Sequence, residues 1–171
     1  RVSWAAPGDW PDRTGEPEWL RQTWFAGNHS DIGGSYAEDE SRLSDISLKW
    51  MIEQATELPH PLKVDRSRLN LFPDPCGMQH DEIESMRDSY PSWVPSSLRY
   101  VWAVHPREVR VDAPLHPSVQ ERFEATNGVL HYGLQTAYRP ANLSSHLKVA
   151  HHFDVDPTRL TAVAQPLATP V

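Results

Sequence analysis

A histidine and an aspartate two residues apart follow a run of strand-forming residues near the start of the chain. His29 and Asp31 come after aromatic and β-branched residues and before the glycine pair Gly33 and Gly34. A neutral imidazole can take a proton from a hydroxyl, and a carboxylate can fix the tautomer of that imidazole. Glycines let a substrate approach the backbone closely or allow a sharp turn. Residues 23–36 are therefore a candidate for acid–base chemistry, with turn and cap hydrogen bonds as the alternative role of the polar pair.

Two further polar side chains stand where they can assist such chemistry. His116 precedes Pro117 and Ser118 and is a candidate second active-site histidine, although helix capping explains the same position. Asp45 is a candidate orienting group for a histidine, although an aspartate in the first turn of a helix needs only the helix dipole. The sequence leaves both alternatives open.

Neither a metal site nor a local serine nucleophile is supported by spacing. His29 and Asp31, with His116 as a third ligand, are suitable ligand types for zinc or manganese. The chain lacks HExxH and other helical two-histidine spacings, so we expect no metal and no organic cofactor. Ser30 and Ser118 are the serines best placed by context, yet the sequence contains no Gly-x-Ser-x-Gly nucleophile elbow.

Length and composition describe one acidic domain. The 171 residues suffice for a single core, while 16 prolines and an apolar fraction of 39% predict long irregular connections. A net charge of −7 argues against a nucleic-acid partner. The sequence has no apolar run long enough for a transmembrane segment. Cys76 is the only cysteine, which excludes an internal disulfide, and we interpret it as an ordinary thiol.

The first residues resemble the interior of a longer protein. The chain begins at Arg1 without a methionine. We therefore expect a fragment, and for a fragment a missing signal peptide carries no information about targeting. A cytoplasmic location and secretion both stay open.

Few regular elements are available to position the polar residues. Residues 18–26 are the best strand candidate, because aromatic and β-branched side chains suit a buried strand. Residues 43–58 predict the clearest helix, whose apolar face is broader than a surface helix needs and therefore predicts thorough burial. Pro117 predicts the start of a short helix, because proline suits the first helical turn.

Irregular connections are expected over much of the remainder. Prolines interrupt residues 59–97, where a helix of one or two turns is expected over residues 81–87. Connections of this length often form lids or rims of functional sites. Residues 98–104 and 108–111 are expected to be extended and to form a hairpin. We expect the last ~10 residues of the chain to be poorly ordered.

Residues 24–36 resemble the signature of an uncharacterised α/β-hydrolase family that includes the phospholipase effectors of bacterial type VI secretion systems. That signature is an aromatic pair and a glycine, then His-Ser-Asp, a hydrophobic residue and two glycines. It stands shortly before a Leu-Ser-Asp helix carrying Trp-Met, which here spans residues 43–51. Two later pieces are similar to the family's usual ending, namely residues 116–119 with Arg122, and residues 138–143.

The resemblance implies a serine hydrolase that acts on ester bonds, with lipids or phospholipids as substrates. It makes His29 the general base and Asp31 the local acid partner, with Asp45 behind it and an upstream acid as a further option. It places Gly33 and Gly34 on the substrate or oxyanion side. The serine elbow would lie upstream of this sequence, so the upstream half of the same domain would be a partner of this chain.

The predicted fold class is α/β. Residues 1–143 are expected to be the C-terminal portion of an α/β-hydrolase-like domain, a mostly parallel sheet flanked by helices, and residues 144–171 a partly disordered tail. We expect His29 at a sheet edge that faces an open cleft, and exposed apolar surface where further strands belong. The alternative function, which belongs to another class, is that of a non-catalytic interaction or structural module, either truncated or degenerate.

Overall fold

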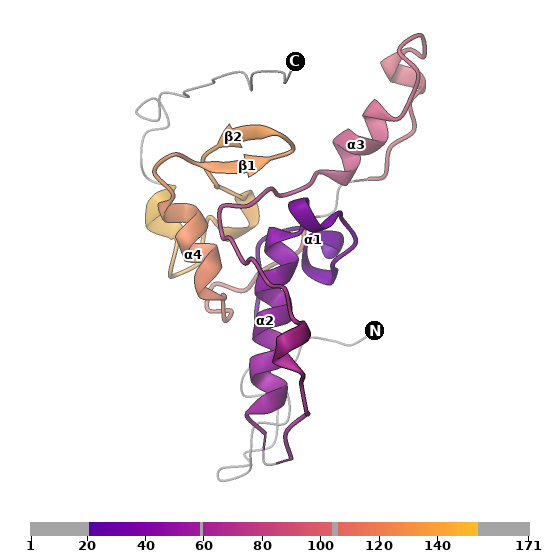
Figure 1. Ribbon diagram of the computed structural model, residues 1–171. Coiled ribbons are helices and arrows are strands. Elements are labelled where there is room, and N and C mark those ends of the chain that lie inside the picture. The colour runs from indigo at the N-terminus through magenta and orange to yellow at the C-terminus, as the bar shows by residue number, and fades with distance from the viewer. Residues whose placement is uncertain (1–20, 59, 104–105, 154–171) are drawn as a thin grey trace.

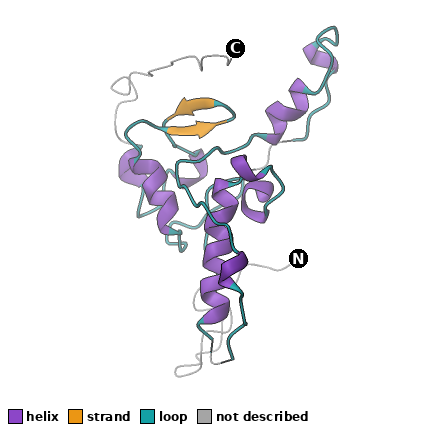
Figure 2. Ribbon diagram, viewed as in Figure 1, coloured by secondary structure: helices purple, strands orange, loops and turns teal. Residues whose placement is uncertain are grey.

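The computed structural model describes residues 21–58, 60–103 and 106–153. In this part of the chain, four α-helices and one two-stranded antiparallel sheet are connected by long loops (Figures 1 and 2). In chain order they are α1 (His29–Gly33), α2 (Arg42–Thr56), α3 (Glu82–Asp88), α4 (Pro117–Glu124), β1 (Val129–His131) and β2 (Leu134–Thr136). Short 3₁₀ helices lie within the loops at Glu38–Glu40, Arg66–Arg68, Ser96–Leu98, Ala141–Leu143 and Ala150–His152. The predicted long irregular connections are confirmed for the described residues.

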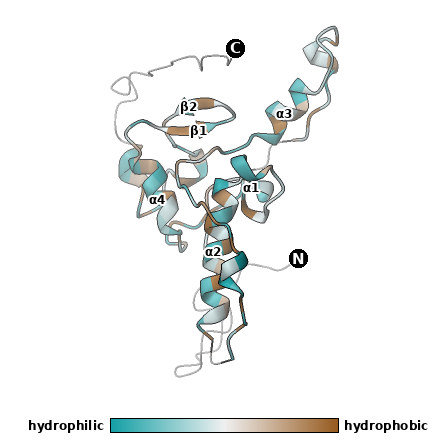
Figure 3. Ribbon diagram, viewed as in Figure 1, coloured by the Kyte–Doolittle hydropathy of each residue, from teal (hydrophilic) through white to brown (hydrophobic). Residues whose placement is uncertain are grey.

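α2 confirms the helix predicted for residues 43–58, but its buried face is narrower than predicted. Ile46 and Ile52 are buried, whereas Leu48 and Met51 are 46% and 57% exposed. Hydrophobic and hydrophilic residues are intermingled along this helix (Figure 3). The difference arises because α1, the helix that contacts α2 most extensively, has only five residues and cannot cover a broad face.

The hydrophobic core joins α4 to two distant segments of the chain. α4 starts with Pro117 in its first turn, as predicted, and buries Val119 and Phe123. The core cluster consists of Ala26, Leu115, Val119, Phe123, Leu143 and Val149. Val149 has no exposed surface. The packed core therefore continues beyond Leu143, through part of the segment expected to be a tail.

The segment before α1 makes one parallel bridge in place of the predicted strand. Trp24 pairs with Leu115: the Trp24 N–H donates to the Pro114 carbonyl at 2.8 Å, and the His116 N–H donates to the Trp24 carbonyl at 2.9 Å. Residues 18–20 of the predicted strand lie outside the described residues. The bridge places the chain just before α1 beside the start of α4.

The sheet that the structure describes is a small hairpin. β1 and β2 are antiparallel, with Val129 opposite Thr136 and His131 opposite Leu134. The chain reverses through Tyr132 and Gly133, both of which have positive φ. A mostly parallel sheet is not seen among the described residues, and the α/β-hydrolase fold stays a prediction.

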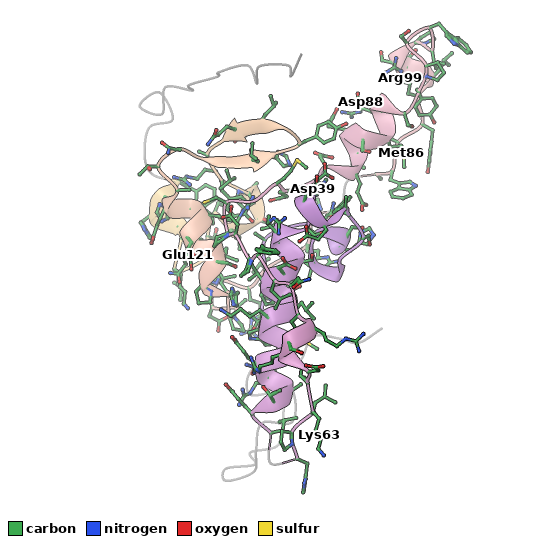
Figure 4. All side chains as sticks on the ribbon, viewed as in Figure 1. Asp39, Lys63, Met86, Asp88, Arg99 and Glu121 are labelled. Carbon is green, nitrogen blue, oxygen red and sulfur yellow. The ribbon has the colours of Figure 1, made fainter. Side chains whose placement is uncertain are left out.

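A projecting arm contains α3 and the loop that follows it (Figure 1). α3 confirms the helical turns expected over residues 81–87, and the Asp81 carboxylate caps it by accepting the N–H groups of Ile83 and Glu84. Met86, Asp88 and Arg99 all lie on this arm (Figure 4).

The hairpin predicted around residues 98–111 is wrong for the described residues, where 99–103 and 106–111 contain no strand. Large side chains of this segment stay exposed, with Tyr100 at 69% and Trp102 at 54%. Strand-forming residue types need a partner strand to satisfy their backbone groups. Residues 104–105 and the end of the chain, 154–171, lie outside the described residues.

Leu143 and Leu147 provide a matched test of the packed C-terminal segment. Leu143→Ala should lower the free energy of unfolding by about 2–4 kcal/mol, because Leu143 is 6% exposed within the core cluster. Leu147→Ala should change it by less than about 0.5 kcal/mol, because Leu147 is 74% exposed. Chemical denaturation measures both values, and equal effects would contradict this packing.

Candidate functional site

The His29-Ser30-Asp31 segment lies on a short helix that begins with a capping box. Asn28 is the N-cap, and its Oδ1 accepts the N–H groups of Ser30 at 2.9 Å and Asp31 at 2.8 Å. In return, Asp31 Oδ2 accepts the Asn28 N–H at 3.0 Å. These reciprocal bonds satisfy donors that the first turn of a helix leaves free. They explain why the chain turns into a helix here and does not end a strand.

Gly27 is the glycine on which the close packing of this turn depends. Its φ is 123°, and a Cβ at this position would lie 2.6 Å from the Asp31 Cβ. By contrast, a Cβ on Gly33 would meet no atom within 4 Å. Gly34 ends α1 in the left-handed conformation, and its N–H donates to the Ser30 carbonyl at 2.9 Å. Since that N–H is already bonded, Gly34 serves here as a helix cap.

Asp31 is buried, and it binds a histidine from a distant loop. Only 3% of Asp31 is exposed. Its Oδ1 lies 2.7 Å from Nδ1 of His80, and its carboxylate also accepts the backbone N–H of His80 at 3.3 Å. An ionised carboxylate can only accept hydrogen bonds, so the Nδ1 of His80 carries the proton. This leaves the Nε2 of a neutral His80 as an acceptor.

Tyr36 and Glu40 complete the surroundings of the His80 ring. The ring of Tyr36 stacks on His80 with 3.4 Å between centroids and 16° between planes. The Tyr36 hydroxyl accepts a hydrogen bond from Asn28 Nδ2 at 3.0 Å. Burial raises the pKa of Tyr36, with the Asp31 carboxylate acting in the same direction. Nε2 of His80 lies 3.4 Å from Glu40 Oε2.

His29, the base predicted from the sequence, lies at the surface. Its side chain is 68% exposed, and its Nε2 is 3.6 Å from Glu82 Oε1. The Ser30 hydroxyl donates to the same Glu82 oxygen at 3.1 Å. His29 thus sits at the start of α1, where a sheet edge was expected. Its role as a base stays a prediction.

Asp45 and His116 both make contacts that stabilise the fold. Asp45 Oδ2 accepts the N–H of Phe72 at 2.8 Å, which attaches the following loop to α2. His116 is the N-cap of α4, and its Nδ1 accepts the Ser118 N–H at 3.2 Å. The His116 ring stacks on Phe25 with 4.7 Å between centroids. Burial lowers the pKa of His116.

Arg122 fixes the loop that leads to His80. This side chain is 1% exposed, and its Nη1 donates to the carbonyls of Pro75 at 2.5 Å and Gly77 at 2.9 Å. Its Nη2 is 3.4 Å from Gln79 Oε1. Burial lowers the pKa of Arg122. The guanidinium thus anchors residues 75–79, directly before His80.

The segment that follows β2 packs against the Arg122 side chain. The Arg122 guanidinium lies over the Tyr138 ring, 4.9 Å from its centroid. Burial raises the pKa of Tyr138 to about 12. Arg139 Nη1 donates to the Phe123 carbonyl at 3.1 Å. Arg122 and Tyr138, one residue from each of the two later motifs, therefore both help to hold the loop of residues 75–79.

Sequence reasoning missed His80, Tyr36 and the task of Arg122. His80 lies in the irregular stretch 59–97 and is 49 residues from Asp31, so no local spacing connects the two. The signals in the sequence were the length of that connection, which suggests a functional rim, and the presence of Tyr36 within the first motif. Neither signal identifies the contact.

The described residues contain no group of three or more histidine, cysteine, aspartate or glutamate side chains suited to a metal ion. In the same part of the chain, none of the helices has the length and apolar character needed to cross a bilayer.

Arg122 and Arg110 provide a matched pair for testing the loop anchor. Arg122→Met should lower the free energy of unfolding by about 3 kcal/mol, because the Pro75 and Gly77 carbonyls would lose a charged donor. Arg110→Met should have an effect within about 1 kcal/mol, because its ion pair with Asp112 is solvent-exposed. Denaturant titration compares them, and a stable Arg122→Met variant would contradict the anchor.

Comparison with known proteins gives a partial match. Residues 2–54, which include α1, match the family model described as "T6SS, Phospholipase effector Tle1-like, catalytic domain". A stretch of 39 residues, 21% of this chain, is 44% identical to the uncharacterized protein YEL023C of Saccharomyces cerevisiae and covers 6% of that protein's length. No solved structure matches the chain. The segment that carries Asp31 is thus similar to the catalytic domain of Tle1-like phospholipase effectors.

Proposed function

We propose that this chain is part of a serine hydrolase that cleaves ester bonds, a lipase or phospholipase of the type VI secretion effector kind. The observation that carries the proposal is the buried Asp31 carboxylate bonded to an imidazole Nδ1 at 2.7 Å. A carboxylate in this position holds a histidine in the tautomer that can accept a proton at Nε2. This pair includes a residue of the segment that is similar to a phospholipase catalytic domain.

In the proposed reaction a serine outside this sequence attacks the carbonyl carbon of a lipid ester. An imidazole of this chain takes the hydroxyl proton and returns it to the departing alcohol, and water then releases the acyl group. Two histidines neighbour the Asp31 turn: His29, to which the family resemblance assigns the base, and His80, which binds Asp31. Backbone N–H groups from upstream would stabilise the oxyanion.

The proposed architecture is an α/β-hydrolase-like domain to which this chain contributes the C-terminal portion. It is supported by two isolated parallel bridges among the described residues, Trp24 with Leu115 and Gln79 with His131. Trp24 precedes Asp31 by seven residues and Gln79 directly precedes His80, so each bridge lies shortly before one partner of the Asp31–His80 contact in the sequence. Further parallel strands would come from upstream sequence in this proposal.

The rival function is a non-catalytic interaction or structural module. The upstream coding sequence discriminates, because an in-frame Gly-x-Ser-x-Gly after a predicted strand supports the hydrolase. A start codon close to Arg1 would contradict it.

The biochemical test uses the complete protein that contains this chain. We expect it to release fatty acid from phosphatidylcholine vesicles and to be labelled by a fluorophosphonate on one serine. Asp31→Asn should lower kcat by about 10²-fold or more, because the imidazole loses its fixed tautomer. The control Asp39→Asn, at an exposed position, should retain wild-type turnover.

One result would contradict the hydrolase, and another would contradict only the role given to Asp31. One is a folded wild-type protein that neither releases fatty acid nor reacts with the fluorophosphonate, which favours the interaction module. The other is an Asp31→Asn variant with the turnover of Asp39→Asn, which would remove the Asp31 turn from the mechanism.

A further inference from the structure

We infer that His80, not His29, is the general base of the proposed hydrolase, and that Asp31 positions it through Nδ1. This inference rests on the proposed function and specifies one residue of its mechanism. The two histidines differ in how firmly they are held, in what each ring nitrogen contacts, and in how exposed each ring is.

The His80 ring is held on several sides. Its Nδ1 donates to Asp31 Oδ1 at 2.7 Å, and its backbone N–H donates to the same carboxylate. Tyr36 covers one face of the ring at 3.4 Å. The side chain is 12% exposed. Reacting groups must be held close to one geometry for efficient proton transfer, and these contacts supply that constraint.

The backbone on both sides of His80 is also fixed. The Gln79 N–H donates to the Leu130 carbonyl at 2.9 Å, and the Gln79 carbonyl accepts the Tyr132 N–H at 2.9 Å. Arg122 holds the carbonyls of Pro75 and Gly77. These bonds therefore hold the loop in the position that brings His80 against Asp31. On the other side, the Asp81 carboxylate caps α3.

The second ring nitrogen of His80, Nε2, faces a group that can move. Nε2 lies 3.4 Å from Oε2 of Glu40, whose side chain is 47% exposed at the end of the 3₁₀ helix Glu38–Glu40. Holding two side chains at such a surface contact gains little free energy. The Glu40 carboxylate can swing into solvent and leave Nε2 to an incoming hydroxyl.

In the proposed reaction Nε2 of His80 first accepts the serine proton and then donates it to the leaving group. The serine Oγ–H proton moves to Nε2 while Oγ bonds to the ester carbonyl carbon, which gives an imidazolium held by the Asp31 carboxylate. When the ester C–O bond breaks, the same proton passes from Nε2 to the departing alkoxide. Water repeats the sequence to release the fatty acid. Asp31 stays ionised throughout.

His29 lacks this support. Its ring is 68% exposed and its contact with Glu82 is 3.6 Å, in competition with the Ser30 hydroxyl at 3.1 Å from the same oxygen. A surface contact of this kind orients a side chain weakly. His29 is nevertheless a suitable control, because it lies on the same helix as Asp31, two residues away.

The test compares His80→Asn with His29→Asn in the complete protein. The amide that His80→Asn introduces can donate to Asp31 in place of the imidazole Nδ1–H, but it accepts no proton. We expect His80→Asn to lower kcat for phosphatidylcholine hydrolysis by about 10²–10⁴-fold with an unchanged Tm. We expect His29→Asn to keep kcat within about twofold of wild type, as a surface change should.

Three results would overturn the inference while leaving the proposed function intact. They are wild-type turnover in folded His80→Asn, a loss in His29→Asn as large as in His80→Asn, or a loss in His29→Asn alone. A wild-type protein without esterase activity would instead remove the proposed function, and the base with it.

A second variant covers the case in which His80→Asn fails to fold. His80→Ala should be inactive, and added imidazole should restore part of its turnover in proportion to the imidazole concentration. A purely structural His80 gives no reason for such rescue. Turnover of His80→Ala that does not rise with imidazole would overturn the inference, as would wild-type turnover without imidazole.

Discussion

The buried carboxylate of Asp31 is the constraint on which the arrangement of this chain depends. It accepts hydrogen bonds from the backbone N–H of Asn28, the backbone N–H of His80 and the ring of His80. Removing a carboxylate from water costs several kcal/mol unless donors replace the lost hydration. Because the donors belong to Asn28 and His80, which are 52 residues apart, satisfying this charge requires the loop before α3 to lie against α1. Local helix capping and long-range packing are thus one interaction.

A second buried charge performs the corresponding task on the opposite side of the loop. Arg122 satisfies its guanidinium with main-chain carbonyls and with the face of Tyr138. Its Nε is the buried side-chain polar atom without a hydrogen-bond partner among the described residues. Loops are fixed most firmly when their backbone groups are paired with side chains from rigid elements. α4 and α1 together hold the segment from Pro75 to His80 and fix the position of its imidazole.

Patterns within short windows predicted what short-range physics determines. The apolar stripe predicted α2, the position of Pro117 predicted α4, and the polar pair made Asp31 a candidate site residue. The predicted breadth of the buried face of α2 was wrong, because burial depends on how many neighbouring elements a helix has. His80 could not be predicted, because its contact with Asp31 depends on how Arg122 and the β1–β2 hairpin route an irregular loop. The assignment of the base to His29 relied on the family resemblance of its motif, which does not show which histidine reaches the carboxylate.

The most direct test of the Asp31–His80 pair is the protonation of the two imidazoles, observed by nitrogen NMR in the complete protein labelled at histidine. We predict that neutral His80 carries its proton on Nδ1 and that this proton exchanges slowly with water, because Asp31 accepts it in a buried position. Asp31→Asn should abolish that protection, while the His29 signals stay those of an exposed ring. A His80 protonated on Nε2, or one whose Nδ1 proton exchanges as fast as that of His29, would contradict the pairing.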